Sequence, residues 1–144
     1  MNIVINNLEK KDYESYLNLM SQFRPIQNKK IPFELFCKLY DKIFLSGEIY
    51  VARLNNTIIG SIKVFYEQKF INNCALYAHI EDVIVDKSHR HFRIGSQLLD
   101  HVKNKAIEQN CFKCTLVCSE EVSKFYLDNQ FEKRGINMSF LIKK

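Results

Sequence analysis

The residues best suited to chemistry lie between His79 and Gly95, in the segment HIEDVIVDKSHRHFRIG. An apolar, strand-like run carries two adjacent carboxylates, Glu81 and Asp82, and a basic turn follows it. Backbone amides and arginines at the start of a helix bind phosphate groups well. The segment therefore indicates a site for a phosphorylated ligand. Phosphate-binding turns usually contain several glycines, whereas this one contains Gly95 alone.

Glu81 and Asp82 are neighbours on the predicted strand, so we expect their side chains on opposite faces of the sheet. They cannot then work as the paired acid and base of a glycosidase. One carboxylate could bind an ammonium group or hydroxyls while the other makes a structural contact. A salt bridge at a strand edge is the alternative for either residue.

The chain before residue 47 predicts a short strand at residues 3–5 and two amphipathic helices. The second helix is expected to begin at Pro32 and to end at Gly47, after a loop at Phe23, Arg24 and Pro25. The apolar stripes of the two helices consist of Tyr13, Tyr16, Leu17 and Met20, and of Phe36, Leu39, Tyr40 and Ile43.

Strands are predicted at residues 49–54, 57–66 and 75–85, the first two joined by a tight Asn55-Asn56 turn. A helix should follow to about residue 109, because Ile94, Leu98 and Val102 recur at helical spacing. Residues 112–118 predict a further strand, Ser119 an N-cap for a short helix, and residues 138–142 a last strand. The strand, helix and strand at 80–118 form a βαβ crossover and imply a parallel pair.

These elements predict the α/β (α+β) class, with a mixed, mostly antiparallel sheet and helices on both faces. The 144 residues and their 47% hydrophobic content suit one domain spanning 1–144. The chain shows no apolar run long enough to cross a membrane and no signal-peptide pattern, and its odd number of five cysteines suggests reduced thiols. We therefore expect a cytoplasmic protein without membrane contact. Its net charge of +5 suits a phosphorylated small molecule as well as nucleic acid, and we expect no nucleic-acid partner.

The element order, together with HIEDVIVD and RHFRIGSQLL, resembles the GCN5-related N-acetyltransferase (GNAT) superfamily, whose pyrophosphate turn has the pattern R/Q-x-x-G-x-G/A. EQKFINNCALYAHIEDVIVD, CFKCTLVC and KFYLDNQF resemble, more narrowly, the glucosamine-6-phosphate N-acetyltransferase family. The resemblance covers nearly the whole chain and is weakest before about residue 45. It implies a GNAT fold with a central parallel strand pair and no metal.

The implied activity is transfer of acetyl from acetyl-coenzyme A (acetyl-CoA) to the amine of D-glucosamine 6-phosphate, by direct attack in a ternary complex. The resemblance also implies a homodimer that serves UDP-N-acetylglucosamine biosynthesis. In such a dimer, residues 138–142 and the basic tail of Lys143 and Lys144 could line the neighbour's phosphate site. An acetyltransferase for another amine, or a coenzyme-binding or interaction module that has lost activity, are the alternatives.

The resemblance places the coenzyme along one strand and the basic turn that follows it. The implied coenzyme-binding residues are Val83, Ile84, Val85, Arg90, His91, Phe92, Arg93, Ile94, Gly95 and Ser96. A buried central strand and a solvated basic loop are the structural alternatives. His91 and Arg93 stand where the family pattern has glycines, so the loop should hold ordinary φ values or lie further from the phosphate. Weaker coenzyme binding is the expected consequence.

The implied substrate-binding residues are Lys69, Phe70, Ile71, Asn72, Glu81, Asp82, Asn110 and Cys111. Asp82 is the candidate for orienting or deprotonating the amine, and the turn at Lys69 the candidate for the phosphate. A hairpin end with a solvated lysine is the alternative for that turn, and core packing is the alternative for Cys111. Val117 stands where the family usually has an acidic residue that contacts the sugar, so the sugar pocket is expected to be altered.

Tyr126 matches a family tyrosine that hydrogen-bonds the coenzyme sulfur and helps the thiolate leave, and a buried core tyrosine is the alternative. Gln130 replaces the glycine that follows in the family pattern, so Asn129 is expected to take the left-handed, helix-ending conformation instead. Cys111-x-x-Cys114 has half the spacing of a zinc site, but core thiols are the preferred interpretation. None of the four histidines has a metal-binding partner visible in the sequence.

Overall fold

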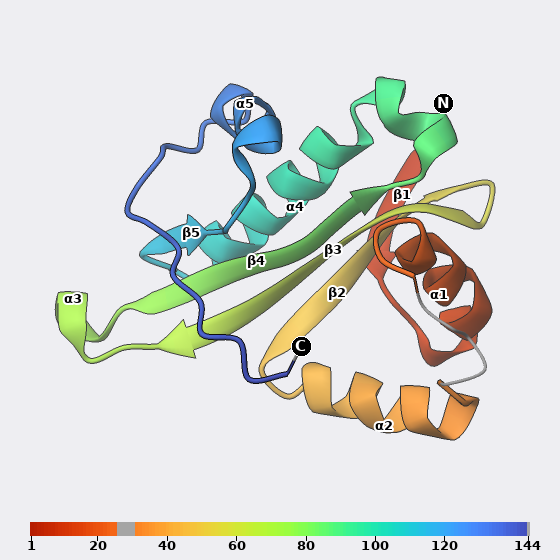
Figure 1. Cartoon of the computed structure of the whole chain (residues 1–144), viewed down its shortest axis with the longest axis horizontal. Helices are drawn as coiled ribbons and strands as arrows, with labels where there is room; N and C mark the ends of the chain where they lie inside the picture. Colours follow the sequence, from red (N-terminus) through yellow and green to blue (C-terminus); the bar gives the residue numbers. More distant parts are fainter. Residues whose placement is uncertain (26–30, 144) are drawn as a thin grey trace.

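The computed structural model describes residues 1–25 and 31–143. Within these residues, five strands form one sheet in the order β1-β2-β3-β4-β5 (Figure 1). Neighbouring strands are antiparallel from β1 to β4, and β4 and β5 are parallel. The strands are β1 (Ile3–Asn7), β2 (Gly47–Leu54), β3 (Thr57–Gln68), β4 (Leu76–Val85) and β5 (Lys113–Thr115). The helices are α1 (Tyr13–Ser21), α2 (Phe33–Ile43), α3 (Ile71–Cys74), α4 (Ile94–Glu108) and α5 (Glu120–Asp128).

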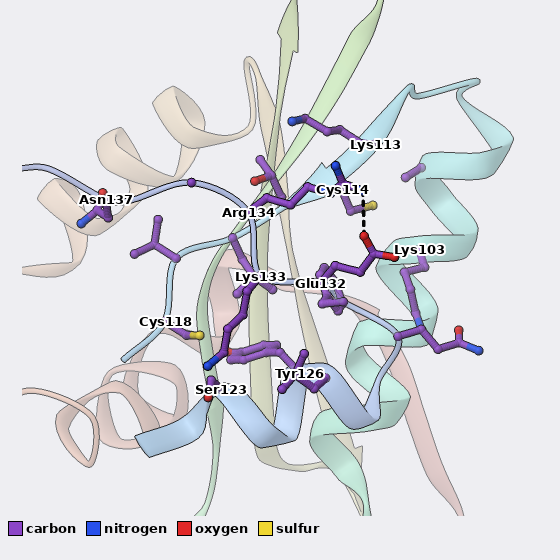
Figure 2. Close-up of a pocket in the computed structure, with 18 of the residues that line it drawn as sticks. Lys103, Lys113, Cys114, Cys118, Ser123, Tyr126, Glu132, Lys133, Arg134 and Asn137 are labelled. Atoms are coloured by element: carbon purple, nitrogen blue, oxygen red, sulfur yellow. Dashed lines mark hydrogen bonds and ion pairs between the residues drawn. The ribbon is translucent and has the colours of Figure 1, made fainter. Parts of the chain in front are cut away.

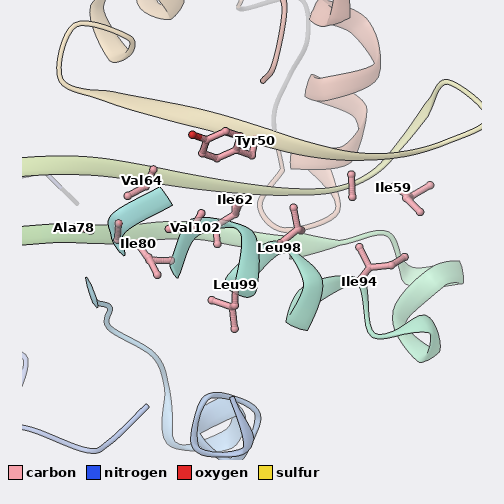
Figure 3. Packing of buried hydrophobic residues seen from close by; sticks show 12 residues of the cluster. Tyr50, Ile59, Ile62, Val64, Ala78, Ile80, Ile94, Leu98, Leu99 and Val102 are labelled. Carbon is pink, nitrogen blue, oxygen red and sulfur yellow. The ribbon is translucent and has the colours of Figure 1, made fainter. Parts of the chain in front are cut away.

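Helix α4 covers one face of the sheet and supplies the larger core. Figure 3 shows Ile94, Leu98 and Val102 of α4 pointing toward β3 and β4. These three side chains recur at the spacing of a helical stripe and are fully buried. They pack on strand residues of the same face, which are Ile59, Ile62, Val64, Ala78 and Ile80. The α4 stripe predicted from the sequence is confirmed.

Helices α1 and α2 cover the opposite face of the sheet, as Figure 1 shows. Their core includes Leu17 and Phe36 from the helices and Ile49 and Ile84 from the strands. The prediction of helices on both faces is therefore confirmed. Leu39 was expected in the apolar stripe of α2 but is 43% exposed.

The Asn55-Asn56 turn between β2 and β3 is confirmed, and both residues adopt positive φ, 48° and 65°. Gly47 does not end α2 as predicted, because it is the first residue of β2 and pairs with Phe65. A Cβ atom at Gly47 would lie 2.2 Å from the carbonyl oxygen of Val64. Gly47 therefore allows β2 and β3 to approach closely. From the sequence alone, a glycine with this role cannot be distinguished from one that ends a helix.

The C-terminal part departs most from the prediction. β5 spans only Lys113–Thr115, and the strand expected at 138–142 is not formed in the described residues. A strand needs a partner edge for its backbone groups, and none pairs with this segment. Ile136 and Phe140 are 90% and 91% exposed. Lys144 lies outside the described residues.

Candidate active site

The β3–β4 pair carries a polar stripe on the face opposite α4. Alternation along each strand creates this stripe, because the intervening residues belong to the α4-side core. Its members face each other across the strands, with Lys63 opposite Glu81 and Phe65 opposite His79. The acceptor face, as we call it, consists of Lys63, Phe65, Glu67, Tyr77, His79, Glu81 and Asp82.

Asp82 lies in a β-bulge that interrupts the regular strand. The β3–β4 register shifts between Ser61 and Lys63, and Asp82 has a φ of 51°. The carboxylate of Asp82 lies 3.5 Å from the ammonium of Lys63, which is also the cross-strand neighbour of Glu81. Both carboxylates therefore lie on the acceptor face, and the prediction of opposite faces was wrong because it assumed a regular strand.

Glu67 links His79 and Lys69 on the same face. Its two carboxylate oxygens lie 2.6 Å from Nζ of Lys69 and 2.6 Å from Nε2 of His79. These bonds, first to Lys69 and then to His79, lower the pKa of Glu67. The His79 ring stacks on Phe65, with ring centres 4.6 Å apart. The imidazole is thus fixed between the phosphate-site candidate Lys69 and the carboxylates at the bulge.

Lys113 joins Lys69 at the end of the acceptor face, a position that the sequence did not reveal. The ammonium groups of Lys69 and Lys113 lie 5.2 and 4.9 Å from the centre of the Tyr77 ring. Asn72 donates a hydrogen bond of 2.6 Å to the Tyr77 hydroxyl. Both ammonium groups therefore lie close to the Tyr77 ring, and lysine is a side chain that binds phosphate monoesters. The predicted parallel pairing of β4 and β5 could have indicated this position, because it places Lys113 opposite Tyr77.

The predicted substrate turn carries backbone strain. Asn72, Asn73 and Cys74 all adopt positive φ, between 53° and 57°. Phe70 and Ile71 are exposed and point away from the core. Left-handed non-glycine residues are uncommon, and a run of three is found where surrounding contacts impose it. The turn that follows Lys69 thus has an unusual backbone conformation.

Asn110 and Cys111 lie at the end of α4 rather than on the acceptor face. Asn110 is exposed and adopts a φ of 56°, which ends the helix. Cys111 is half-buried, packs against the α4-side core and has a pKa raised by burial. The geometry favours the packing alternative for Cys111.

The basic turn contains a left-handed residue although it lacks the expected glycines. Lys87–Phe92 is a 3₁₀ segment, and Arg93 adopts a left-handed conformation with a φ of 58° before α4 begins. Arg93 therefore takes a backbone conformation that normally favours glycine, contrary to the expectation of ordinary φ values. Arg90, His91, Phe92 and Arg93 are exposed, while Ile94 and Gly95 are buried. The first amides of α4 have no intrahelical partner and can bind an anion.

β4 and β5 diverge in the part of β4 that leads to this turn. Their ladder ends at the pair of His79 with Thr115. The described part of β5 therefore does not pair with Val83, Ile84 or Val85 farther along β4. Ile84 is buried, whereas Val83 and Val85 are half-buried and pack against the α4-side core. This edge offers backbone groups to an extended chain such as pantetheine while the side chains pack.

Helix α5, which carries Tyr126, packs against the beginning of α4. A Cβ atom at Gly95 would lie 2.9 Å from the ring of Phe125. Tyr126 and Cys118 line a cavity of about 660 Å³ between β5, α5 and the C-terminal segment (Figure 2). Burial, followed by the nearby Cys118, raises the pKa of Tyr126. Its hydroxyl therefore remains a proton donor at neutral pH.

Gln130, not Asn129, takes the left-handed conformation at the end of α5, with a φ of 71°. The amides of Phe131 and Gln130 donate to the carbonyls of Tyr126 and Leu127, both at 3.0 Å. This is the Schellman pattern of a helix end. The loss of the family's glycine thus leaves the position of Tyr126 well defined.

The predicted residues fall into two neighbouring groups rather than one cavity. Glu81 and Asp82 lie on the acceptor face, and Lys69 and Asn72 lie in the turn at its end. The basic turn and Tyr126 lie instead with α4 and α5. The divergence of β4 from β5 lies between them. Among the predicted site residues, only Tyr126 and Cys111 line the described cavity.

Two further features of the described residues bear on the class of protein. No cluster of three or more histidine, cysteine or acidic residues there could hold a metal ion. No helix in the same residues is long and apolar enough to span a membrane.

The mixed sheet, its bulge, the divergence of β4 and β5 and the turn before α4 together define an acetyltransferase of the GNAT fold. The chain belongs to the Acetyltransferase (GNAT) family, whose sequence profile matches residues 13–131. Acetyltransferases of this family use acetyl-CoA.

Within the GNAT family, the chain is similar to proteins named glucosamine 6-phosphate N-acetyltransferase. The chain is 37% identical over 87 residues to glucosamine 6-phosphate N-acetyltransferase 1 of Dictyostelium discoideum, covering 60% of this chain and 55% of that protein. It is 31% identical over 127 residues to a probable glucosamine 6-phosphate N-acetyltransferase of Drosophila melanogaster, covering 85% of this chain and 57% of that protein. The chain therefore spans somewhat more than half the length of these relatives.

A solved structure is similar over the whole chain. The glucosamine-6-phosphate N-acetyltransferase of Arabidopsis thaliana superposes with a TM-score of 0.91 at 26% identity. The match covers 99% of this chain and 100% of that one. The described C-terminal segment belongs to this shared architecture.

Proposed function

We propose that the protein transfers the acetyl group of acetyl-CoA to the amine of D-glucosamine 6-phosphate. The observation that carries this proposal is the layout of the acceptor face, which has Glu81 and Asp82 at one end and Tyr77, with Lys69 and Lys113 close to its ring, at the other. Lys69 and Lys113 suit the phosphate, and Glu81 and Asp82 suit the amino-sugar end. The names of the relatives support the same acceptor.

The coenzyme would bind along the edge of β4 and at the basic turn. Val83, Ile84 and Val85 would offer backbone groups to the pantetheine arm. Arg90, Arg93 and the amides from Ile94 to Ser96 would hold the pyrophosphate, with His91 and Phe92 beside it. The left-handed Arg93 supports this fit, because it reproduces a glycine conformation and adds a positive charge. When bound, the coenzyme supplies an activated thioester.

The chain's own residues would then support direct transfer. Asp82 orients the amine, which forms a C–N bond to the acetyl carbon and gives up one proton to the solvent. The C–S bond breaks, and the Tyr126 hydroxyl stabilises the departing thiolate by donating a hydrogen bond. The raised pKa of Tyr126 supports this role, because only the protonated hydroxyl can donate.

The acceptor can be tested directly by thiol release. Three acceptors would be compared, namely glucosamine 6-phosphate, glucosamine and a lysine peptide. Release with the first alone supports the proposal. A preference for another amine would assign the protein to a different acceptor. Val117 would fit that result, because it is exposed and replaces an acidic residue that contacts the sugar in the family. Coenzyme binding without release from any acceptor would indicate a module that has lost activity.

We further propose a homodimer that uses the C-terminal segment 132–143. In this segment Ile136, Met138, Phe140 and Ile142 are at least 87% exposed, an unusual run of apolar side chains for a free surface. β5 pairs with β4 on one side only within the described sheet, so its other edge can accept a strand. A partner's residues 138–142 would fill that edge, and its Lys143 would approach the phosphate end of the acceptor face.

The mass in solution tests this arrangement. Light scattering is expected to give twice the 17.1 kDa of the chain, and deletion after Gly135 is expected to yield monomers. A monomeric intact chain would reject the dimer while leaving the acetyltransferase proposal open to its own test.

We place this activity in a single domain spanning residues 1–144, in the cytoplasm, at the acetylation step of UDP-N-acetylglucosamine biosynthesis. All five cysteines are free thiols, which supports a reducing compartment.

A further inference from the structure

The side-chain amide of Gln22 contacts the start of the basic turn. Gln22 is the residue that caps the C-terminal end of α1. Its Nε2 donates a hydrogen bond of 2.7 Å to Oδ2 of Asp86, and its Oε1 accepts one of 3.1 Å from the backbone amide of Lys87. One side chain from a distant helix thus holds two consecutive residues at the beginning of the turn.

Asp86 continues this network into the turn itself. Its Oδ1 accepts hydrogen bonds from the Ser88 amide at 2.9 Å and from the His89 ring at 2.8 Å. The backbone amide of Asp86 also donates to the carbonyl of Ile59, at 2.8 Å. Both carboxylate oxygens are therefore occupied, and the turn is tied to α1 and β3.

The rest of the turn has fewer such ties. Arg90 makes only a long bond of 3.4 Å to the Val85 carbonyl, and the Phe92 carbonyl accepts one of 3.5 Å from Gln97. Arg93 occupies a left-handed conformation that is unfavourable for a non-glycine residue. A turn without the family's glycines is therefore held chiefly from its N-terminal end.

We propose that Gln22 is a positioning residue for the coenzyme, which acts by fixing the 86–89 network and hence the amides that face the pyrophosphate. This inference rests on the proposed function, because it assumes that the turn binds coenzyme A. It makes the end of α1, a helix of the acceptor-side layer, part of the coenzyme site. Gln22 itself touches neither substrate.

Gln22→Ala tests the proposal, with Ser21→Ala as the matched control one residue earlier. Calorimetry with coenzyme A should show binding about three- to tenfold weaker for Gln22→Ala, since one hydrogen bond to a charged group is lost. Ser21→Ala should bind like the wild type, because Ser21 bonds only to the Asn18 carbonyl of its own helix. In turnover, the KM for acetyl-CoA should rise while kcat and the KM for the acceptor stay within about twofold.

Gln22→Glu adds a readout that a merely structural role would not produce. The charged and titratable groups around position 22 are Asp86 at the end of β4, Lys87 and His89 in the turn, and Arg24. At pH 8 two carboxylates would face each other, and binding should weaken by about tenfold or more. A protonated glutamate has one O–H donor and one acceptor, like the amide of Gln22. Binding should therefore return to within about threefold of the wild type at pH 5, each compared at the same pH.

Ser21→Glu controls for the added charge, because it places a carboxylate on α1 away from Asp86. It should show no recovery at pH 5 beyond that of the wild type. Equal coenzyme affinity of Gln22→Ala and the wild type would overturn the proposal, as would a lower melting temperature with unchanged affinity. A wild type that does not bind coenzyme A would instead reject the proposed function.

Discussion

The ammonium group of Lys63 lies 3.5 Å from a carboxylate oxygen of Asp82, the residue at the bulge of β4. Both side chains are partly exposed on the acceptor face, so the pair is accessible to a ligand. A cation at this place offsets the attraction of Asp82 for an ammonium group. In the proposed reaction it would thereby favour the neutral amine, which is the form that attacks a thioester.

Lys63→Met should therefore change the pH dependence of turnover. Without the lysine, Asp82 and Glu81 would hold the amine of the proposed acceptor more firmly as ammonium. The acid limb of kcat should move to higher pH by roughly half a pH unit, since such exposed pairs contribute about 0.2–1 kcal/mol. The KM for the amino sugar should fall slightly. Lys63→Arg, which keeps the charge, should retain the wild-type limb, and an unmoved limb in Lys63→Met would reject this role.

Tyr126→Phe should lower kcat by about 10- to 100-fold, because the thiolate loses its hydrogen-bond donor. The affinity for coenzyme A, measured by calorimetry, should remain within about twofold. Tyr66→Phe is the matched control, since the Tyr66 hydroxyl is also buried but packs with the α4-side core, outside the proposed site. Turnover of Tyr126→Phe equal to that of the control would assign Tyr126 to core packing.

Local periodicity predicted the elements whose patterns are complete within a short window. The α4 stripe and the Asn55-Asn56 hairpin are of this kind, since helical spacing and positive φ are encoded by nearby residues. The strand at 138–142 was not predictable in the same way, because a strand forms only against a partner edge. Gly47 shows a different limit. A glycine that ends a helix and one that admits a close strand look identical in sequence.

Residue types indicated the candidate site residues, whereas the way the fold arranges them could not be derived from the sequence. Asp82 was identified as a candidate, but its bulge was not, since Glu81, Asp82 and Val83 read as an ordinary strand. Lys113 was not a candidate, because its proximity to Tyr77 arises from the parallel pairing of β4 and β5. Such contacts join residues far apart in the chain, which spacing alone does not relate.

Substitutions at Arg93 should separate its backbone strain from its charge. Arg93→Gly and Arg93→Ala both remove the guanidinium, but only glycine adopts a φ of 58° without penalty. Arg93→Gly should therefore be more stable than Arg93→Ala by about 1 kcal/mol in urea unfolding. Arg90 supplies the control, because it lies in the right-handed 3₁₀ segment. There Ala should be more stable than Gly, and the same sign at both positions would contradict the left-handed turn.

Asp86 should make the protein sensitive to acid. Hydrogen bonds from Gln22, and next from His89, lower the pKa of Asp86 to about 2, from an ordinary value of 3.8. A carboxyl whose pKa is lower in the folded state stabilises that state above its unfolded pKa, and this contribution is lost as pH falls through the folded pKa.

The free energy of unfolding, measured in urea, should therefore fall between about pH 4 and pH 2. Asp86→Asn should flatten that decline, because the asparagine does not titrate, although it should be less stable at pH 7. Asp128→Asn is a suitable comparison, since Asp128 forms only an exposed ion pair with Lys124. It should retain the wild-type decline, and an equally steep decline in Asp86→Asn would show that other carboxyls cause it.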